Sequence, residues 1–345
     1  MRKVLILSAM VSFIVFACKN TGDKETSAGA ADDTKLLETA NSFFQSISSL
    51  ELQDPDPAKV ELGKYLFFDT RLSQTGKISC NSCHGLDTYG VDNKRFSEGD
   101  DGSLGNRNSP TVFHASIHKM QFWDGRAKDV EEQAGGPILN PVEHNIKNKE
   151  QLVERLKGVE MYQEMFANAF HDHDDPITFD NVTNAIGAFE RTLNPESRFD
   201  KFLDGDVSQL TEAEKRGLNS FISSGCITCH SGPALGGHML QKFGLFSDYW
   251  VETESENIDN GLFDISNDEA DKYFFKVPGL RNIAHTAPYF HDGSVDDLKA
   301  AVRIMGRLQR NVDLSDEEVN DIVAFLESLT SDIPEDVKRS PFENI

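Results

Sequence analysis

Two short stretches of the sequence place two cysteines and a histidine at the same spacing, Cys80-x-x-Cys83-His84 and Cys226-x-x-Cys229-His230. In an exported protein this CxxCH pattern is typical of covalent c-type haem attachment. The two thiols add to the vinyl groups of the porphyrin, and the histidine is then placed to bind the iron. A zinc site would need two more soft ligands nearby, and a thioredoxin-like pair would need a βαβ context. The sequence shows neither, so we expect two haem c groups.

The group on the other side of each iron decides the chemistry. For the second haem, the candidates downstream of His230 are His238, Met239, His285 and Met305. We expect Met305, in the helix-like segment AVRIMGRL, because a histidine–methionine pair gives the high potential of electron-carrying cytochromes. Most helix methionines only fill core space, so the residues alone leave the other three open.

For the first haem, the segment 85–110 contains neither histidine nor methionine and is instead glycine-rich and acidic. A sixth ligand close in sequence is therefore absent, although His114, His118 or Met120 could in principle reach the iron. We expect an open iron face, to which water, dioxygen or peroxide can bind.

The N-terminus has the features of an export signal. Residues 1–17 combine a basic start with an apolar run too short to span a membrane comfortably, which predicts a signal peptide and a periplasmic protein. The sequence VFAC that ends at Cys18 resembles a bacterial lipoprotein cleavage box, so a lipid on Cys18 could anchor the protein to the membrane. Residues 18–48 would then form a flexible tether.

Cysteine and charge counts limit the remaining possibilities. One of the five cysteines belongs to the export signal and the others to the two CxxCH motifs, so none is left for a disulfide. The formal net charge of −23 becomes −25 when the basic residues Arg2 and Lys3 leave with the signal. Such a surface disfavours nucleic acid and anionic lipid, and it suits a basic protein partner.

Helical signals dominate the rest of the chain. Residues 179–193 carry apolar side chains at helical spacing, and two capping boxes, Thr211-x-x-Glu214 and Ser315-x-x-Glu318, open further helices. Long segments with strand-like alternation are scarce. We predict an all-α protein of two cytochrome c-like domains with long functional loops, each domain holding one haem. The predicted ranges are 49–200 for the N-terminal domain, 201–330 for the C-terminal domain and 331–345 for a tail.

Several stretches resemble the bacterial di-haem cytochrome c peroxidases and the related enzymes that mature methylamine dehydrogenase. They are LGKYLFFDTRLS, SCNSCHG, GNRNSPTVFHASIHKMQFWDGRAKDVEEQAGGPILNPVEH, SRFDKFLDGD, KRGLNSFISSGCITCHSGPALGG and VPGLRNIAHTAPYFHDGSVDDLKAAVRIMG, which together cover about residues 50–330. The resemblance implies an enzyme that reduces hydrogen peroxide to water with two electrons from a small cytochrome c or cupredoxin. The alternatives are a non-catalytic di-haem electron carrier and an enzyme that oxidises a protein partner.

The resemblance also implies a division of labour between the haems. His84 would be the proximal ligand of the peroxidatic haem, whereas His230 and Met305 would hold the high-potential haem that receives electrons. Trp123 would carry electrons between the two. The maturation enzymes place a tyrosine where this chain has Met305, which argues against oxidation of a protein partner.

Five further residues take roles from the same resemblance. Glu143 and Gln133 would form the distal pocket, with the carboxylate moving a proton and the amide orienting peroxide. A calcium ion between the domains would be bound by Asn108 and by the backbone carbonyls of Thr286 and Pro288. Relatives are often dimers, so a homodimer is also expected.

One position departs from many of these relatives. Asp100 stands where they have a histidine on the far side of the first haem, a ligand that leaves only after the second haem is reduced. An aspartate is a poor replacement for that ligand, so we expect a site that is already open in the resting oxidised state. Whether reductive activation is needed stays open from the sequence.

Overall fold

The computed structural model describes residues 22–343, and the predicted signal peptide and Cys18 lie outside this range. The helices are α1 (Gly22–Asn41), α2 (Pro57–Phe68), α3 (Cys80–Cys83), α4 (Val130–Leu139), α5 (Lys149–Lys157), α6 (Glu160–Ala169), α7 (Phe179–Glu190), α8 (Arg198–Leu203), α9 (Glu212–Ser223), α10 (Tyr249–Glu252), α11 (Phe263–Ser266), α12 (Leu298–Arg310), α13 (Asp316–Glu327) and α14 (Glu335–Lys338). The strands, β1 (Leu240–Lys242) and β2 (Phe274–Lys276), form one antiparallel pair. The predicted predominance of helix is confirmed.

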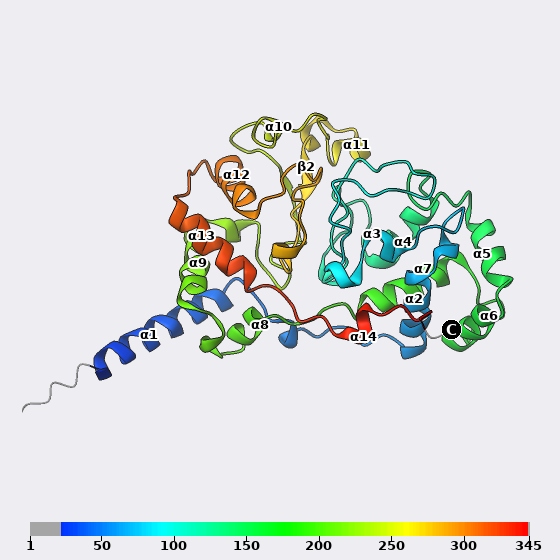
Figure 1. Cartoon of the computed structure of the whole chain (residues 1–345), viewed down its shortest axis with the longest axis horizontal. Coiled ribbons are helices and arrows are strands. Elements are labelled where there is room, and N and C mark those ends of the chain that lie inside the picture. Colours follow the sequence, from blue (N-terminus) through cyan, green and yellow to red (C-terminus); the bar gives the residue numbers. More distant parts are fainter. Residues whose placement is uncertain (1–21, 344–345) are drawn as a thin grey trace, which may run out of the picture.

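Each half of the molecule is built around one pair of crossing helices. In the N-terminal half α2 packs across α7, and in the C-terminal half α9 packs across α13 (Figure 1). A glycine lies at each crossing. A Cβ atom on Gly63 of α2 would lie 1.9 Å from the carbonyl oxygen of Ala185, and one on Gly217 of α9 would lie 1.8 Å from that of Asp321. Only glycine therefore allows either pair to approach so closely.

Local sequence explains where these four helices begin. Pro57 occupies the first turn of α2, and the side chain of Asp56 accepts a hydrogen bond from the N–H of Ala58. Thr178 caps α7 in the same way. The capping boxes predicted at Thr211 and Ser315 are both present, at the start of α9 and α13. All four starts place an apolar stripe against the partner helix.

The segment before residue 50 belongs to the C-terminal half. Ala40 and Phe44 are buried among the residues of α8, α9 and α13, with Leu36 and Leu37 packed beside them. Ile47 is also buried, and its N–H donates to the carboxylate of Asp200 at 2.9 Å. The flexible tether predicted over 18–48 therefore does not describe this segment. Apolar residues at helical spacing between 36 and 44 make α1 amphipathic, and the polar run before them hides that pattern.

The C-terminal tail, in turn, packs against the N-terminal half. Ile333 and Val337 contact the core of the N-terminal half, and the ring of Phe342 lies 5.3 Å from that of Tyr65 in α2. The two chain ends are thus exchanged between the halves (Figure 1). The predicted ranges 49–200 and 201–330 each contain one of the helix crossings, and they leave out these two segments. The predicted boundary between 200 and 201 also falls inside α8, whose Phe199 packs in the core of the C-terminal half.

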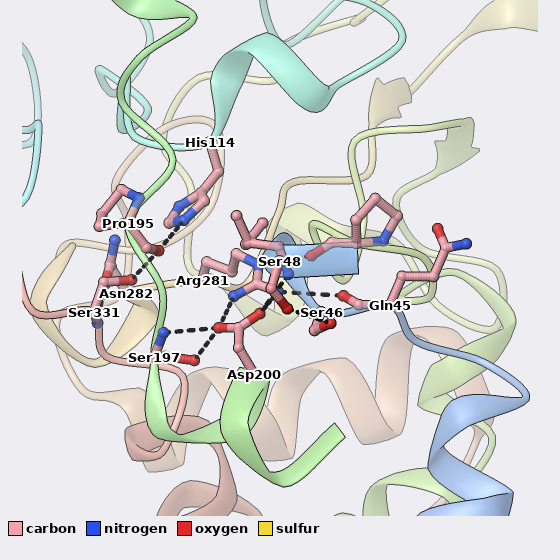
Figure 2. Close-up of polar contacts among 12 residues, drawn as sticks. Gln45, Ser46, Ser48, His114, Pro195, Ser197, Asp200, Arg281, Asn282 and Ser331 are labelled. Atoms are coloured by element: carbon pink, nitrogen blue, oxygen red, sulfur yellow. Dashed lines mark hydrogen bonds and ion pairs between the residues drawn. The ribbon is translucent and has the colours of Figure 1, made fainter. Parts of the chain in front are cut away.

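A buried polar cluster holds the junction between the halves (Figure 2). Arg281 forms a bidentate ion pair with Asp200, through contacts of 2.7 and 2.8 Å, and both side chains are almost wholly buried. Asp200 also accepts hydrogen bonds from the N–H and hydroxyl of Ser197. His114, from the N-terminal half, donates from Nε2 to the carbonyl of Pro195 at 2.8 Å. These contacts join the linker, the N-terminal segment and the loop after β2.

Within residues 22–343, no helix combines the length and the apolar composition needed to cross a membrane.

Candidate haem sites and their surroundings

The N-terminal CxxCH forms a single helical turn. Ser79 caps α3 in a capping box with Ser82, and the N–H of His84 donates to the carbonyl of Cys80 at 2.9 Å. Nδ1 of His84 lies 3.3 Å from the carbonyl oxygen of Gly90. The turn therefore brings both thiols and the imidazole to one side of the segment.

The C-terminal CxxCH has the same design. Gly225, in the left-handed conformation, ends α9 and lets the chain turn directly into the motif. The N–H of His230 donates to the carbonyl of Cys226 at 2.9 Å, and its Nδ1 lies 3.0 Å from the carbonyl oxygen of Leu235. In both motifs a carbonyl five or six residues downstream anchors the histidine ring.

These contacts prepare both histidines to bind a metal. An Nδ1–H donated to a carbonyl fixes the tautomer and leaves the Nε2 lone pair free, which is the arrangement of iron-binding imidazoles. Burial lowers the pKa of His230 to about 4 and also lowers the pKa of His84, so both rings are neutral near pH 7. All four motif cysteines are free thiols. The residues present thus fit two covalent haems.

A mainly apolar cavity of about 260 Å³ opens beside the C-terminal motif. Cys226, Cys229 and His230 line it, and so does Met305, which α12 presents from the other side. His238, Met239 and His285 are not among its lining residues. Instead His285 stacks on Tyr89 with ring centroids 4.2 Å apart. Of the four candidates for the sixth ligand of the second haem, the geometry favours Met305.

The cavity beside the N-terminal motif differs in character. It measures about 390 Å³, reaches Cys83, and carries polar and charged groups that include Asp92, Lys94 and Glu98. Neither histidine nor methionine lines it, so His84 does not border it, and the predicted distal residues Glu143 and Gln133 do not border it either. His114 and His118 line the C-terminal cavity instead, and the sulfur of Met120 packs against Gly125. None of the three residues considered as distant ligands therefore borders this cavity.

Asp100 is committed to a neighbouring turn. It is 2% exposed, and its two carboxylate oxygens accept hydrogen bonds from the N–H and the hydroxyl of Thr75, at 2.8 and 2.9 Å. Burial alone would raise the pKa of Asp100, but hydrogen bonds from Ser73, Thr75 and Lys77 bring it below its ordinary value. The charged carboxylate is thus held by the protein at the edge of the cavity.

Glu143 lies beside this loop, in the turn that follows α4. Its carbonyl accepts from the N–H of Asp100 at 2.9 Å, and its carboxylate accepts from Nδ2 of Asn140 at 2.9 Å. Burial raises the pKa of Glu143. The pKa of the Cys83 thiol is raised to about 11, mainly by burial and then by the negative charges of Asp92 and Glu143. Gln133 lies on α4, partly exposed, and no hydrogen bond joins its amide to Glu143 among the described residues.

Sequence reasoning missed the histidine that follows Glu143. His144 is 4% exposed, and its Nδ1 lies 3.0 Å from the carbonyl oxygen of Leu72. Burial lowers its pKa, and His84 contributes in the same direction, which puts the two rings in the same part of the N-terminal half. A histidine beside a carboxylate in the sequence VEHN was the available signal.

Trp123 links the two halves. Its indole N–H donates to the carbonyl of Asn108 at 2.8 Å, and the N–H of Asn108 donates to the carbonyl of His291 at 2.7 Å. The indole also lies edge-on to the ring of His291, with centroids 6.3 Å apart, and it lines the C-terminal cavity. The tryptophan therefore joins a segment of the N-terminal half to a loop of the C-terminal half.

The three residues expected to hold calcium line the same cavity. Nδ2 of Asn93 donates to the carbonyls of His285 and Ala287, at 3.1 and 2.9 Å. The carbonyls of Thr286 and Pro288 alternate with these two along the chain. They accept no hydrogen bond from the described residues, and neither does Oδ1 of Asn108. Three hard oxygens without donors suit calcium. No cluster of three His, Cys, Asp or Glu able to hold a metal occurs among the described residues.

Comparisons with known proteins point in one direction. Residues 57–208 match the family model described as di-haem cytochrome c peroxidase. The chain is 46% identical to a cytochrome c551 peroxidase of Nitrosomonas europaea, with 90% of both chains covered. It is 44% identical to a cytochrome c551 peroxidase of Pseudomonas aeruginosa, with 87% of both covered. A crystal structure of a MauG-like protein associated with microbial copper homeostasis matches with a TM-score of 0.73 and 32% identity, covering 83% of this chain and 92% of that one.

Proposed function

Because this chain belongs to the di-haem cytochrome c peroxidase family and is therefore a haem oxidoreductase acting on peroxide, we propose that it reduces hydrogen peroxide to water with two electrons from a small cytochrome c or cupredoxin. One hydrogen peroxide, two protons and two electrons give two waters. The observation that carries the proposal is the contrast between two equally anchored motifs. Met305 borders the cavity of His230, whereas the segment 85–110 that follows His84 contains neither histidine nor methionine.

In this proposal the two halves are cytochrome c-like domains with different tasks. Cys226, Cys229 and His230 hold the haem that receives electrons, with Met305 as its sixth ligand. Cys80, Cys83 and His84 hold the haem at which peroxide is reduced. The haems supply the electrons and the iron to which peroxide binds. The residues around them supply position, proton transfer and exclusion of competing ligands.

Glu143 is the proton carrier of the N-terminal site. Its Oε1 accepts from Asn140, which fixes the carboxylate and leaves Oε2 available. Oε2 would take one proton from hydrogen peroxide and return it to the oxygen that leaves as water. Burial raises the pKa of Glu143, and a raised pKa suits a carboxyl group that must both gain and release a proton. Gln133 orients the peroxide through its amide.

Asp100 keeps the N-terminal site open. Both of its oxygens are occupied by Thr75, so this residue does not supply the ligand that many relatives remove by reduction. We infer that peroxide can enter the resting oxidised enzyme without a prior activation step. Trp123 carries the electrons from one half to the other, and a calcium ion held by Asn108, Thr286 and Pro288 keeps the two loops beside it in register.

The remaining features place the enzyme outside the cytoplasm. The signal 1–17 directs it to the periplasm, and a lipid on Cys18 would hold it at the membrane surface. The acidic chain attracts a basic donor protein and binds no nucleic acid. Like many relatives, the enzyme is expected to form a homodimer.

Two measurements test this function together. Steady-state reduction of peroxide with a reduced small cytochrome should show turnover. Electron spin resonance of the resting oxidised protein should show one high-spin signal beside one low-spin signal. Two low-spin signals without turnover would identify an electron carrier instead. Met305→His should lower the midpoint potential of the C-terminal haem, since methionine ligation raises it. An unchanged potential would assign the sixth position to another residue.

A further inference from the structure

One buried cation of the C-terminal half has no carboxylate partner among the described side chains of residues 31–343. Lys276, the last residue of β2, is 4% exposed and lines the C-terminal cavity. Its Nζ lies 3.3 Å from Nδ1 of His118, the one hydrogen-bonding partner that it has in this range. A lysine ammonium carries three N–H donors. Two of them are therefore left without an acceptor inside the protein.

The position of His118 is tightly constrained. The residue comes from the N-terminal half, and its ring lies between two glycines of the C-terminal half. A Cβ atom on Gly237 would lie 2.2 Å from Cδ2 of His118, and one on Gly279 would lie 2.8 Å from its Nε2. The N–H of Lys119 donates to the carbonyl of Gly237 at 2.8 Å. The ring thus fits a slot that any side chain at either glycine would fill.

His118 is a neutral acceptor for the lysine. Burial, followed by the charge of Lys276, lowers its pKa well below the ordinary value. The proton of the neutral ring then lies on Nε2, and Nδ1 accepts one N–H from Lys276. His118 therefore orients the ammonium without neutralising its charge.

Other buried cations of this structure have carboxylates. Arg281 is paired with Asp200, and Arg107 bonds both Asp124 and Asp259. No carboxylate oxygen among the described side chains of residues 31–343 lies within 4.0 Å of Lys276. Burial lowers the pKa of Lys276 to about 8, with Asp124 acting in the opposite direction. A buried charge of this kind is normally paired, so the missing partner points to a ligand.

The position of the lysine identifies the chemical class of that ligand. Lys276 borders the cavity that Cys226, Cys229 and His230 also border. β2 lies on the side of the C-terminal half that faces the N-terminal half (Figure 1). Haem carries two propionate carboxylates, and a carboxylate both accepts the free N–H donors and neutralises the charge.

We propose that Lys276, positioned by His118, forms an ion pair with a propionate of the haem in the C-terminal half. His118 would make this contact depend on both halves, because the N-terminal half supplies the residue that orients the lysine. The cation beside this haem favours its reduced form and so keeps its potential high. The inference rests on the proposed covalent haem in this cavity.

The test uses the full-length holoenzyme with labelled propionates. Cells are supplied with 5-aminolaevulinate carrying carbon-13 in its carboxyl group, which labels the haem carboxylates. Redox-difference infrared spectra and midpoint potentials are then compared for Lys276→Met and for Lys242→Met, a matched lysine change on the paired strand β1 whose residue does not line the cavity. We expect Lys276→Met to shift a labelled carboxylate band and to lower the potential of the C-terminal haem alone. Lys242→Met should do neither.

Two further variants keep the test decisive. Lys276→Arg retains a cation with several donors and should restore both readouts, and His118→Asn should weaken both while leaving the charge in place. A fall in potential without a shift of the labelled band would mean that Lys276 acts only as a distant charge, which overturns the ion pair. An unaltered potential in Lys276→Met would overturn it as well. Absence of a second covalent haem from the unmodified protein would instead refute the proposed function.

Discussion

The two halves of this molecule share their framework and differ in the cavity that lies beside each CxxCH motif. In both, a glycine allows two helices to cross, Gly63 of α2 against α7 and Gly217 of α9 against α13. The distances from a Cβ atom built on each glycine to the facing carbonyl oxygen differ by only 0.1 Å. In both, the histidine of the motif donates to a downstream carbonyl. The C-terminal cavity then meets Met305 and apolar side chains, whereas the N-terminal cavity is lined by polar groups. One framework thus carries two CxxCH motifs in different surroundings, because the loops beside the motifs differ.

The largest expected effect is predicted for a change at Glu143, a residue that has no counterpart in the C-terminal half. Glu143→Gln should slow peroxide turnover by roughly 10²–10⁴-fold, the contribution of general acid–base catalysis, because an amide cannot carry the proton. Haem content and both midpoint potentials should stay unchanged, as measured by absorption spectra and redox titration. Glu132→Gln, a change on the exposed surface of α4, serves as the control. Wild-type turnover in Glu143→Gln would remove this residue from the mechanism.

The second expected effect concerns the buried ion pair that joins Asp200 of α8 to Arg281 in the loop after β2. Asp200→Asn leaves Arg281 buried without its partner, which should lower the free energy of unfolding by about 3–5 kcal/mol in urea titrations. Asp175→Asn breaks the exposed ion pair with Lys157 and should cost at most about 1 kcal/mol. Equal costs for the two variants would mean that the buried ion pair stabilises the protein no more than an exposed one.

The same carboxylate predicts a pH dependence. Burial opposes ionisation of Asp200, but Arg281 and the N–H groups of Ser197 and Ile47 lower its pKa below the ordinary value. A depressed pKa in the folded state contributes stability above the pKa of the unfolded chain, and this contribution is lost as the pH falls through the folded value. Acid should therefore destabilise the wild type more than Asp200→Asn, and the two urea midpoints should converge at low pH.

The helix crossings test whether the shared framework is equally important in both halves. Gly63→Ala and Gly217→Ala place a methyl group against a backbone carbonyl that cannot move aside, so each should cost about 1–3 kcal/mol by overpacking. Gly158→Ala is the matched control, because the nearest atom to its new Cβ would lie 3.4 Å away. Thermal unfolding of the holoenzyme measures all three. A small effect at either crossing would show that this helix pair separates easily and that the similarity is only geometric.

Sequence alone predicted the parts of this arrangement that depend on local patterns. The CxxCH spacing located both motifs, the capping boxes located α9 and α13, and apolar spacing located α7. The placement of Met305 on a helix was also predicted, and the cavity supports it over its three competitors. Each of these features is encoded within about one helical turn or one periodic segment.

Features that depend on distant contacts could not be predicted in this way. The pairing of Lys276 with His118 joins residues separated by 158 positions, and the slot for the ring is made by two glycines that have no local signature. The exchange of chain ends was missed for a related reason. Polar residues surround the few apolar ones in α1 and in the tail, and only the opposite half provides the surface that buries them.

The smallest expected effect distinguishes the ways in which the crossing helices begin. Both helices of the C-terminal half start in a capping box, whereas α2 and α7 start with a single side-chain cap. Thr211→Ala and Ser315→Ala should each cost about 1 kcal/mol, the ordinary contribution of an N-cap. Because Glu214 is also held by Arg198, the N-terminal turn of α9 should stay ordered in Thr211→Ala, and that of α13 should fray in Ser315→Ala. Amide hydrogen exchange over the first turn of each helix measures this difference, and equal fraying would mean that Arg198 does not support the cap.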